Sequence, residues 1–123
     1  MELVRRCFDA MNAGDLDTLL ELVDDDIVAD VPTGYANADT YRGRDGFRRM
    51  AEQWLEPWSS FHAEPLDFIE RGDAVVIPIR QSATGRESGI EVEMDLAYLV
   101  RVRDDKLVEW RLCKDAAEAL ELC

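Results

Sequence analysis

Apolar residues recur every three or four positions in three stretches of the N-terminal half, which predicts three amphipathic helices. The first stretch ends at Gly14, a residue suited to a helix C-terminus, and contains Leu3, Val4, Cys7, Phe8 and Met11. The second begins after Asp15, a good N-cap, and contains Leu16, Leu19, Leu20 and Val23. The third ends before Pro57 and contains Phe47, Met50, Ala51, Trp54 and Leu55.

The rest of the chain has the pattern of strands. Residues 27–31 predict a short strand, and the long loop after it is marked by Pro32, Gly34, Asn37 and Gly43. From residue 60 the period changes to two, and turn signals divide this region into four antiparallel strands at Gly72-Asp73, residues 85–89 and Asp104-Asp105. Residues 91–103 alternate most clearly. A last short helix is capped by Asp115 and contains Ala116, Ala119 and Leu120.

This order, α-α-β-α-β-β-β-β-α, predicts a single α+β domain over residues 1–123 with helices on one sheet face. Trp110 and Leu112 can face inward beside Tyr98 if the last connection between strands has an odd number of residues. Asp105 would then take the left-handed conformation in that connection.

The charge and composition of the chain exclude several classes of partner and site. The formal net charge is −13, which repels phosphate backbones and anionic membranes, so we expect no nucleic-acid and no membrane partner. No apolar run approaches bilayer length and no signal peptide is recognisable, so we expect a cytoplasmic protein. Cys7, Cys113 and Cys123 lack metal-ligand spacing and His62 is the only histidine, so we expect no metal and no cofactor. The acidic run over residues 24–26 is interpreted as a solvated corner.

Four short motifs accompany this order: Asn12-Ala13-Gly14-Asp15-Leu16-Asp17, Tyr41-Arg42-Gly43-Arg44-Asp45-Gly46, Gly72-Asp73 and Asp105-Lys106-Leu107-Val108-Glu109-Trp110-Arg111. Together they resemble the nuclear-transport-factor-like superfamily, in particular its SnoaL-like and ketosteroid-isomerase-like members, over nearly the whole chain. The resemblance implies a cone, in which a curved antiparallel sheet wraps three N-terminal helices around a central apolar pocket, with a short C-terminal helix. It also implies a homodimer.

Three polar residues are candidates for chemistry in that pocket. Asp30 falls where the resemblance implies a proton-shuttling Asp, and it shares a strand face with Val28 that we expect to point inward. Burial would raise the pKa of its carboxyl group and suit it to acid–base work; the alternative is a cap on the turn that follows, or a solvated side chain. Tyr98 falls where the isomerases carry a protonated acid, and Gln81 adds an amide to the same face.

Other positions depart from the relatives. Cys7, a weak donor, stands where the resemblance implies the phenolic donor of the isomerases, so their two-donor oxyanion hole is not preserved. The Arg and two Asp residues of limonene-epoxide-hydrolase-like members are replaced by Ile79, Gln81 and Leu112, which excludes epoxide opening. Candidate ligand-binding residues, for which plain core packing is the alternative, are Phe8, Tyr35, Trp54, Trp58, Phe61, Trp110 and Leu112.

Two functions follow from these expectations. One is an isomerase or cyclase that transfers a proton alpha to a carbonyl of an apolar small molecule, with Asp30 as proton shuttle and Tyr98 and Gln81 orienting an oxygen. The alternative is a non-catalytic ligand-binding or dimerisation module. A homodimer would use the outer sheet face, where Ala97 and Leu99 lie among charged residues. His62 is expected at the rim.

Overall fold

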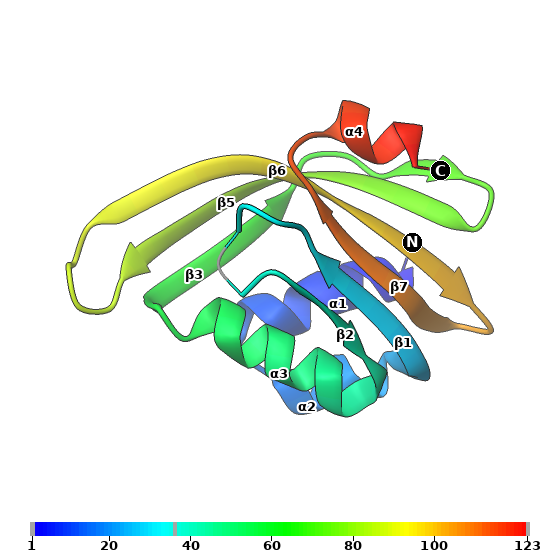
Figure 1. The fold of residues 1–123 in the computed structure, drawn as a ribbon, viewed down its shortest axis with the longest axis horizontal. Coiled ribbons are helices and arrows are strands. Elements are labelled where there is room, and N and C mark those ends of the chain that lie inside the picture. Colours follow the sequence, from blue (N-terminus) through cyan, green and yellow to red (C-terminus); the bar gives the residue numbers. More distant parts are fainter. Residues whose placement is uncertain (1, 36, 123) are drawn as a thin grey trace.

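The computed structural model describes residues 2–35 and 37–122, a curved sheet with helices on both faces (Figure 1). The helices of this described part are α1 (Glu2–Asn12), α2 (Leu16–Glu21), α3 (Gly43–Leu55) and α4 (Ala116–Glu121). Its strands are β1 (Val23–Val31), β2 (Asp39–Arg42), β3 (Trp58–Pro65), β4 (Ile69–Arg71), β5 (Ala74–Gly85), β6 (Glu91–Arg103) and β7 (Lys106–Cys113). The predicted α+β class is confirmed.

The sheet is mixed rather than wholly antiparallel. Its strand order is β2-β1-β7-β6-β5-β3, and β4 pairs with residues 74–76 at the start of β5. β1 and β7 run parallel, whereas the other pairs are antiparallel. The antiparallel expectation was wrong at this one pair because β1 is separated from β7 by most of the chain, and no hairpin fixes their direction.

Helices α1, α2 and α3 lie on the inner face of the sheet, and α4 lies on the outer face (Figure 1). The inner face carries most of the core, in which the ring of Phe8 on α1 lies 5.9 Å from that of Tyr98 and 5.7 Å from that of Trp110. At the far edge, the side chain of Asn12 exchanges two hydrogen bonds with the backbone of Ala63 on β3. The sheet is thereby attached to the helical layer at both its middle and its edge.

Several element bounds differ from the prediction. Val23 begins β1 instead of continuing the second helix, because it pairs with Leu107 of β7 and is fully buried there. The expected acidic corner is therefore part of a strand, where Arg44 forms an ion pair with Asp25 and donates to the Val23 carbonyl. The strand predicted from residue 60 to the Gly72-Asp73 turn is divided into β3 and β4, and the short strand β2 was not predicted because it depends on its pairing with β1 and has no alternation of its own.

The last hairpin places Trp110 and Leu112 inward by a route that differs from the expected one. Its turn has two residues, Asp104 and Asp105, both left-handed with φ of 52° and 61°. Even spacing alone would turn Trp110 outward, but the register shifts by one between Arg101 and Val102. The extra residue that was expected in the turn therefore lies in a bulge between β6 and β7, and Tyr98 pairs with Leu112.

The C-terminal helix α4 covers part of the outer sheet face. Ala97 and Leu99, expected at a dimer interface, are fully buried there together with Ala119 of α4. Covering by the chain's own helix removes this apolar pair as an exposed surface, so that expectation was wrong. No described helix is long and apolar enough to cross a membrane. Cys7 and Cys113 are buried and free, and Cys123 lies outside the described residues.

Candidate functional site

Two cavities lie between the inner sheet face and α3. The inner cavity has a volume of about 20 Å³, which is room for about one water molecule. Its lining is almost wholly apolar and consists of Met11, Leu19, Val31, Phe47, Met50, Ala51, Trp54, Leu55, Tyr98, Trp110 and Leu112. The central pocket is therefore filled largely by the chain's own side chains.

The second cavity, which we call the mouth cavity, is larger, at about 150 Å³. It lies where β5 and β6 extend past the helices (Figure 1), so that Met94 on the inner side of β6 is 39% exposed. Its lining comes from the loop after β1, from α3 and the turn that follows it, and from β5 and β6: Tyr35, Asn37, Gln53, Trp54, Pro57, Trp58, Gln81 and Met94. A cavity of this volume accommodates a benzene-sized ring.

Trp54 lines both cavities and stands between them. Its position follows from the helical spacing of α3, which turns Met50 and Trp54 toward the sheet on successive turns. The Trp54 side chain is therefore part of the wall of both cavities.

Two residues that line the mouth cavity each have a buried polar atom with no hydrogen-bond partner within the described residues. The atoms are Nε1 of Trp54 and Oε1 of Gln81. Gln81 is 2% exposed and is the one buried polar residue among the described core positions. Strand parity explains its placement, because Gln81 follows Ile77 and Ile79 on the inner face of β5. A buried polar group without a partner is costly, which is the signature of a site that a ligand completes.

The titratable groups that line the two cavities are the phenols of Tyr35 and Tyr98. Burial raises the pKa of Tyr98 well above its ordinary value, with a smaller contribution from the neighbouring Tyr35. Burial also raises the pKa of Tyr35, helped by the negative charges of Glu118 and Asp115 on the outer side. Both phenols are therefore protonated at neutral pH. None of the described side chains that line the two cavities carries a charge.

Asp30 does not point into either cavity, and its expected inward orientation was wrong. Ala29 and Val31 of β1 are buried in the inner core, so the residue between them faces the other side of the sheet. There Asp30 accepts a hydrogen bond of 2.9 Å from Oγ1 of Thr40 on the neighbouring β2. The parity argument failed because it placed Val28 rather than Ala29 on the inner face.

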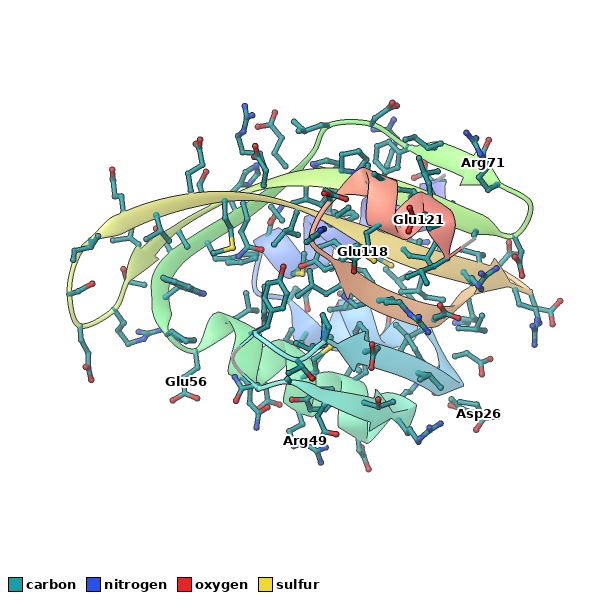
Figure 2. The ribbon with its side chains drawn as sticks, turned by 45° about the horizontal axis from the view of Figure 1, so that its top comes forward. Asp26, Arg49, Glu56, Arg71, Glu118 and Glu121 are labelled. Atoms are coloured by element: carbon teal, nitrogen blue, oxygen red, sulfur yellow. The ribbon has the colours of Figure 1, made fainter. Side chains whose placement is uncertain are left out.

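The remaining candidates divide between core and surface. Phe8 is buried in the aromatic cluster and Phe61 packs at the margin of the core, and neither lines the two cavities. Burial raises the pKa of the Cys7 thiol to about 12, so Cys7 is a core side chain. His62 is exposed on the outer face of β3, as expected for a rim residue. Figure 2 likewise shows Asp26, Arg49 and Glu56 at the margin of the molecule, pointing away from the ribbon.

Sequence reasoning found Gln81 and Tyr35 but missed the site roles of Asn37, Gln53 and Tyr41 at the mouth cavity. The hydroxyl of Tyr41 donates to the Asn37 carbonyl at 2.6 Å and lies 3.1 Å from Oε1 of Gln53. This buried tyrosine therefore holds the loop of Asn37 against α3. Loop contacts of this kind have no periodicity, so only the motif that contains Tyr41 gave any signal.

The opposite wall is held by Arg86 at the tip of the β5–β6 hairpin. Its backbone N–H donates to the Pro57 carbonyl at 2.8 Å, Nε donates to the Glu56 carbonyl at 3.1 Å, and Nη2 donates to the Trp58 carbonyl at 2.9 Å. These carbonyls follow the end of α3, where the helix dipole favours a cation. Arg86 therefore fixes the turn that carries Trp58.

Comparison with known proteins identifies the family. Residues 4–110 match the SnoaL-like domain. An NTF2-like protein of unknown function from Burkholderia pseudomallei superposes with a TM-score of 0.84 at 22% identity, over 99% of this chain and 95% of that one. TerC, co-crystallised with polyporic acid, gives a TM-score of 0.82 at 21% identity, over 98% and 95%. A putative polyketide cyclase from Sinorhizobium meliloti gives 0.74 at 23% identity, over 91% and 94%.

No curated protein sequence matches this chain. At these identities the similar structures establish the fold alone, whereas the domain match covers most of the sequence. Both agree with the four motifs and with the cone of helices and curved sheet. The chain belongs to the SnoaL-like family and has the NTF2-like fold.

Proposed function

We propose that the protein binds an uncharged, largely apolar small molecule in the mouth cavity. The observation that carries this proposal is a cavity of about 150 Å³ whose described lining is mostly aromatic and amide, without charge, and includes two residues with buried polar atoms that lack described partners. Sites of this composition bind drug-like or metabolite-like molecules, because the apolar wall supplies affinity and the few polar groups supply orientation. Small-molecule binding is also what the family and the similar structures support.

The test compares quinoline, which is neutral, with quinoline-2-carboxylate, which is anionic. We expect quinoline to shift the indole ¹⁵N–¹H resonances of Trp54 and Trp58 saturably. The carboxylate should bind at least about tenfold more weakly, because a desolvated anion finds no cation in the cavity. Equal binding of the two compounds, or binding of neither, contradicts the proposal.

A blocking variant tests the location. Met94→Trp puts a large side chain into the mouth cavity and should abolish quinoline binding. Glu93→Trp is the matched control, because Glu93 is the preceding residue of β6 and faces the outer side of the sheet. Quinoline binding that survives Met94→Trp would place the site elsewhere.

Catalysis of proton transfer next to a carbonyl is the second candidate, and one similar structure favours it, the putative polyketide cyclase. In this chain the acid–base groups at the cavities are protonated phenols, which can donate to a carbonyl oxygen but cannot accept the α-proton. Binding is therefore the function that the geometry favours. The exchange of the α-protons of 2-tetralone with D₂O distinguishes the two functions: acceleration of this exchange by the protein that is lost in Tyr35→Phe, the phenol that lines the mouth cavity, would establish catalysis instead.

A further inference from the structure

We propose that the ligand carries a hydrogen-bond donor next to a carbonyl oxygen, as a cyclic lactam or an enolised carbonyl compound does. This inference rests on the proposed function of the mouth cavity and names the class of ligand that the cavity takes. Its basis is that one unpartnered buried donor, Trp54 Nε1, and one unpartnered buried acceptor, Gln81 Oε1, belong to walls of the same cavity.

Each of these atoms imposes one requirement. An indole N–H donates and cannot accept, so Trp54 requires an acceptor on the ligand. An amide oxygen accepts and cannot donate, so Gln81 Oε1 requires a donor. Because Trp54 lies on α3 and Gln81 on β5, the two requirements come from opposite layers of the domain. A ligand inserted between the layers satisfies both requirements only if it carries a donor as well as an acceptor.

Other ligand classes meet only one requirement. A simple ketone has an acceptor but no donor, and so leaves Gln81 Oε1 buried and unpaired. A carboxylate has no donor at neutral pH, and its charge is unfavourable in a chain of net charge −13. An ammonium group lacks the acceptor that the Trp54 indole requires. The aromatic wall, which includes Tyr35 and Trp58, favours a flat ring as the carrier of the donor–acceptor pair.

The experiment uses pairs of compounds that differ by one methyl group. 2-Quinolone has an N–H beside its carbonyl, and 1-methyl-2-quinolone has lost that N–H. 3-Hydroxychromone and 3-methoxychromone form the corresponding pair for the enol arm. By titration calorimetry we expect the donor-bearing member of at least one pair to bind about tenfold tighter, the factor given by one hydrogen bond of ordinary net strength. Which pair is discriminated identifies lactam or enol.

Two site-specific measurements accompany the titration. The Trp54 indole resonance, assigned with Trp54→Phe, should move downfield with the preferred compound, because its N–H gains an acceptor. In Gln81→Leu the preference within the pair should fall to near unity, whereas Ser82→Leu, which changes the outward-facing neighbour on β5, should retain it. A mere packing role of Gln81 would lower the affinity for both members equally and leave their ratio unchanged.

The outcomes separate this inference from the proposed function. Equal affinity within both pairs, or a preference that persists in Gln81→Leu, overturns the donor–acceptor requirement and leaves the binding site standing. If quinoline binds but none of the four paired compounds does, the donor–acceptor requirement is likewise overturned and the binding site still stands. Failure of quinoline and of all four compounds overturns both the requirement and the proposed function.

Discussion

Asn12 and Ala63 are joined by two hydrogen bonds, in which Nδ2 of Asn12 donates to the Ala63 carbonyl at 2.9 Å and Oδ1 accepts from the Ala63 N–H at 2.8 Å. One side chain thereby satisfies both backbone groups of a fully buried residue in the edge strand β3. In Asn12→Ala both groups lose their partner, and we expect the free energy of unfolding to fall by about 1–3 kcal/mol. Urea denaturation measures this, with Ala13→Ser as an exposed neighbouring control. A change no larger than that of the control would contradict it.

In contrast to Asn12→Ala, Gln81→Leu should raise the free energy of unfolding. Its Oε1 is buried without a partner, so replacing it by an apolar side chain of similar size removes a desolvation cost. We expect the ligand-free variant to be more stable by about 1 kcal/mol, measured by urea denaturation beside Ser82→Leu. A destabilised Gln81→Leu would mean that the amide has a structural partner after all.

Asp30→Asn should leave ligand affinity unchanged. The carboxylate faces away from both cavities and its described partner is Thr40, so the amide can retain that hydrogen bond through its oxygen. Affinity for quinoline is the measurement, and Gln81→Leu serves as the variant that alters the cavity. Loss of binding in Asp30→Asn would restore the role at the pocket that the resemblance implied.

The buried thiol of Cys7 predicts a loss of stability at high pH. Its pKa is raised by burial from 9.0 to about 12, so between these values the unfolded chain ionises this thiol while the folded chain keeps it neutral. Stability is therefore full below pH 9 and falls as the pH rises toward 12, by up to about 1.4 kcal/mol per pH unit. Unfolding measured in reducing buffer from pH 8 upward should show a smaller slope in Cys7→Ala. Identical slopes would contradict the prediction.

Homodimerisation through the outer sheet face stays a prediction. With Ala97 and Leu99 covered by α4, the open part of that face lies on β3, β5 and β6, where Arg80 pairs with Asp95 at 3.1 Å. We expect sedimentation velocity at micromolar concentration to give a dimer and Arg80→Glu to dissociate it, because the reversed charge adds to an already acidic surface. Arg71→Glu on β4 is the control. A monomeric wild-type protein would rule the interface out.

The sequence was sufficient to predict those helices and strands whose buried residues recur at a regular spacing. The helical stripes of α1 and α3 and the alternation of β6 gave the fold class, because a repeated pattern records which face of an element is buried. The short strand β2 was missed because it has no alternation of its own and depends on its pairing with β1. The bulge near Val102 was missed for a related reason: parity arguments count residues and cannot locate where one residue is skipped.

The candidate site was predicted only in part. Strand parity placed Gln81 and Tyr98 on the inner face, and helical spacing placed Trp54 beside them. The same method failed for Asp30, because its short strand contains apolar residues on both faces, Val28 as well as Ala29. Asn37 and Gln53 were beyond reach, since their place at the mouth depends on a hydrogen bond network centred on Tyr41.

The three hydrogen bonds of Arg86 brace one side of the mouth cavity. The turn that carries Trp58 is clamped to a hairpin about thirty residues farther along the chain. On the other side, the described residues of the loop are held by a backbone bond of 3.3 Å from the Tyr35 N–H to the Pro32 carbonyl and by the bond from the Tyr41 hydroxyl to the Asn37 carbonyl. The shape of the mouth cavity therefore depends on Arg86 and Tyr41, two residues that hold its walls without lining it.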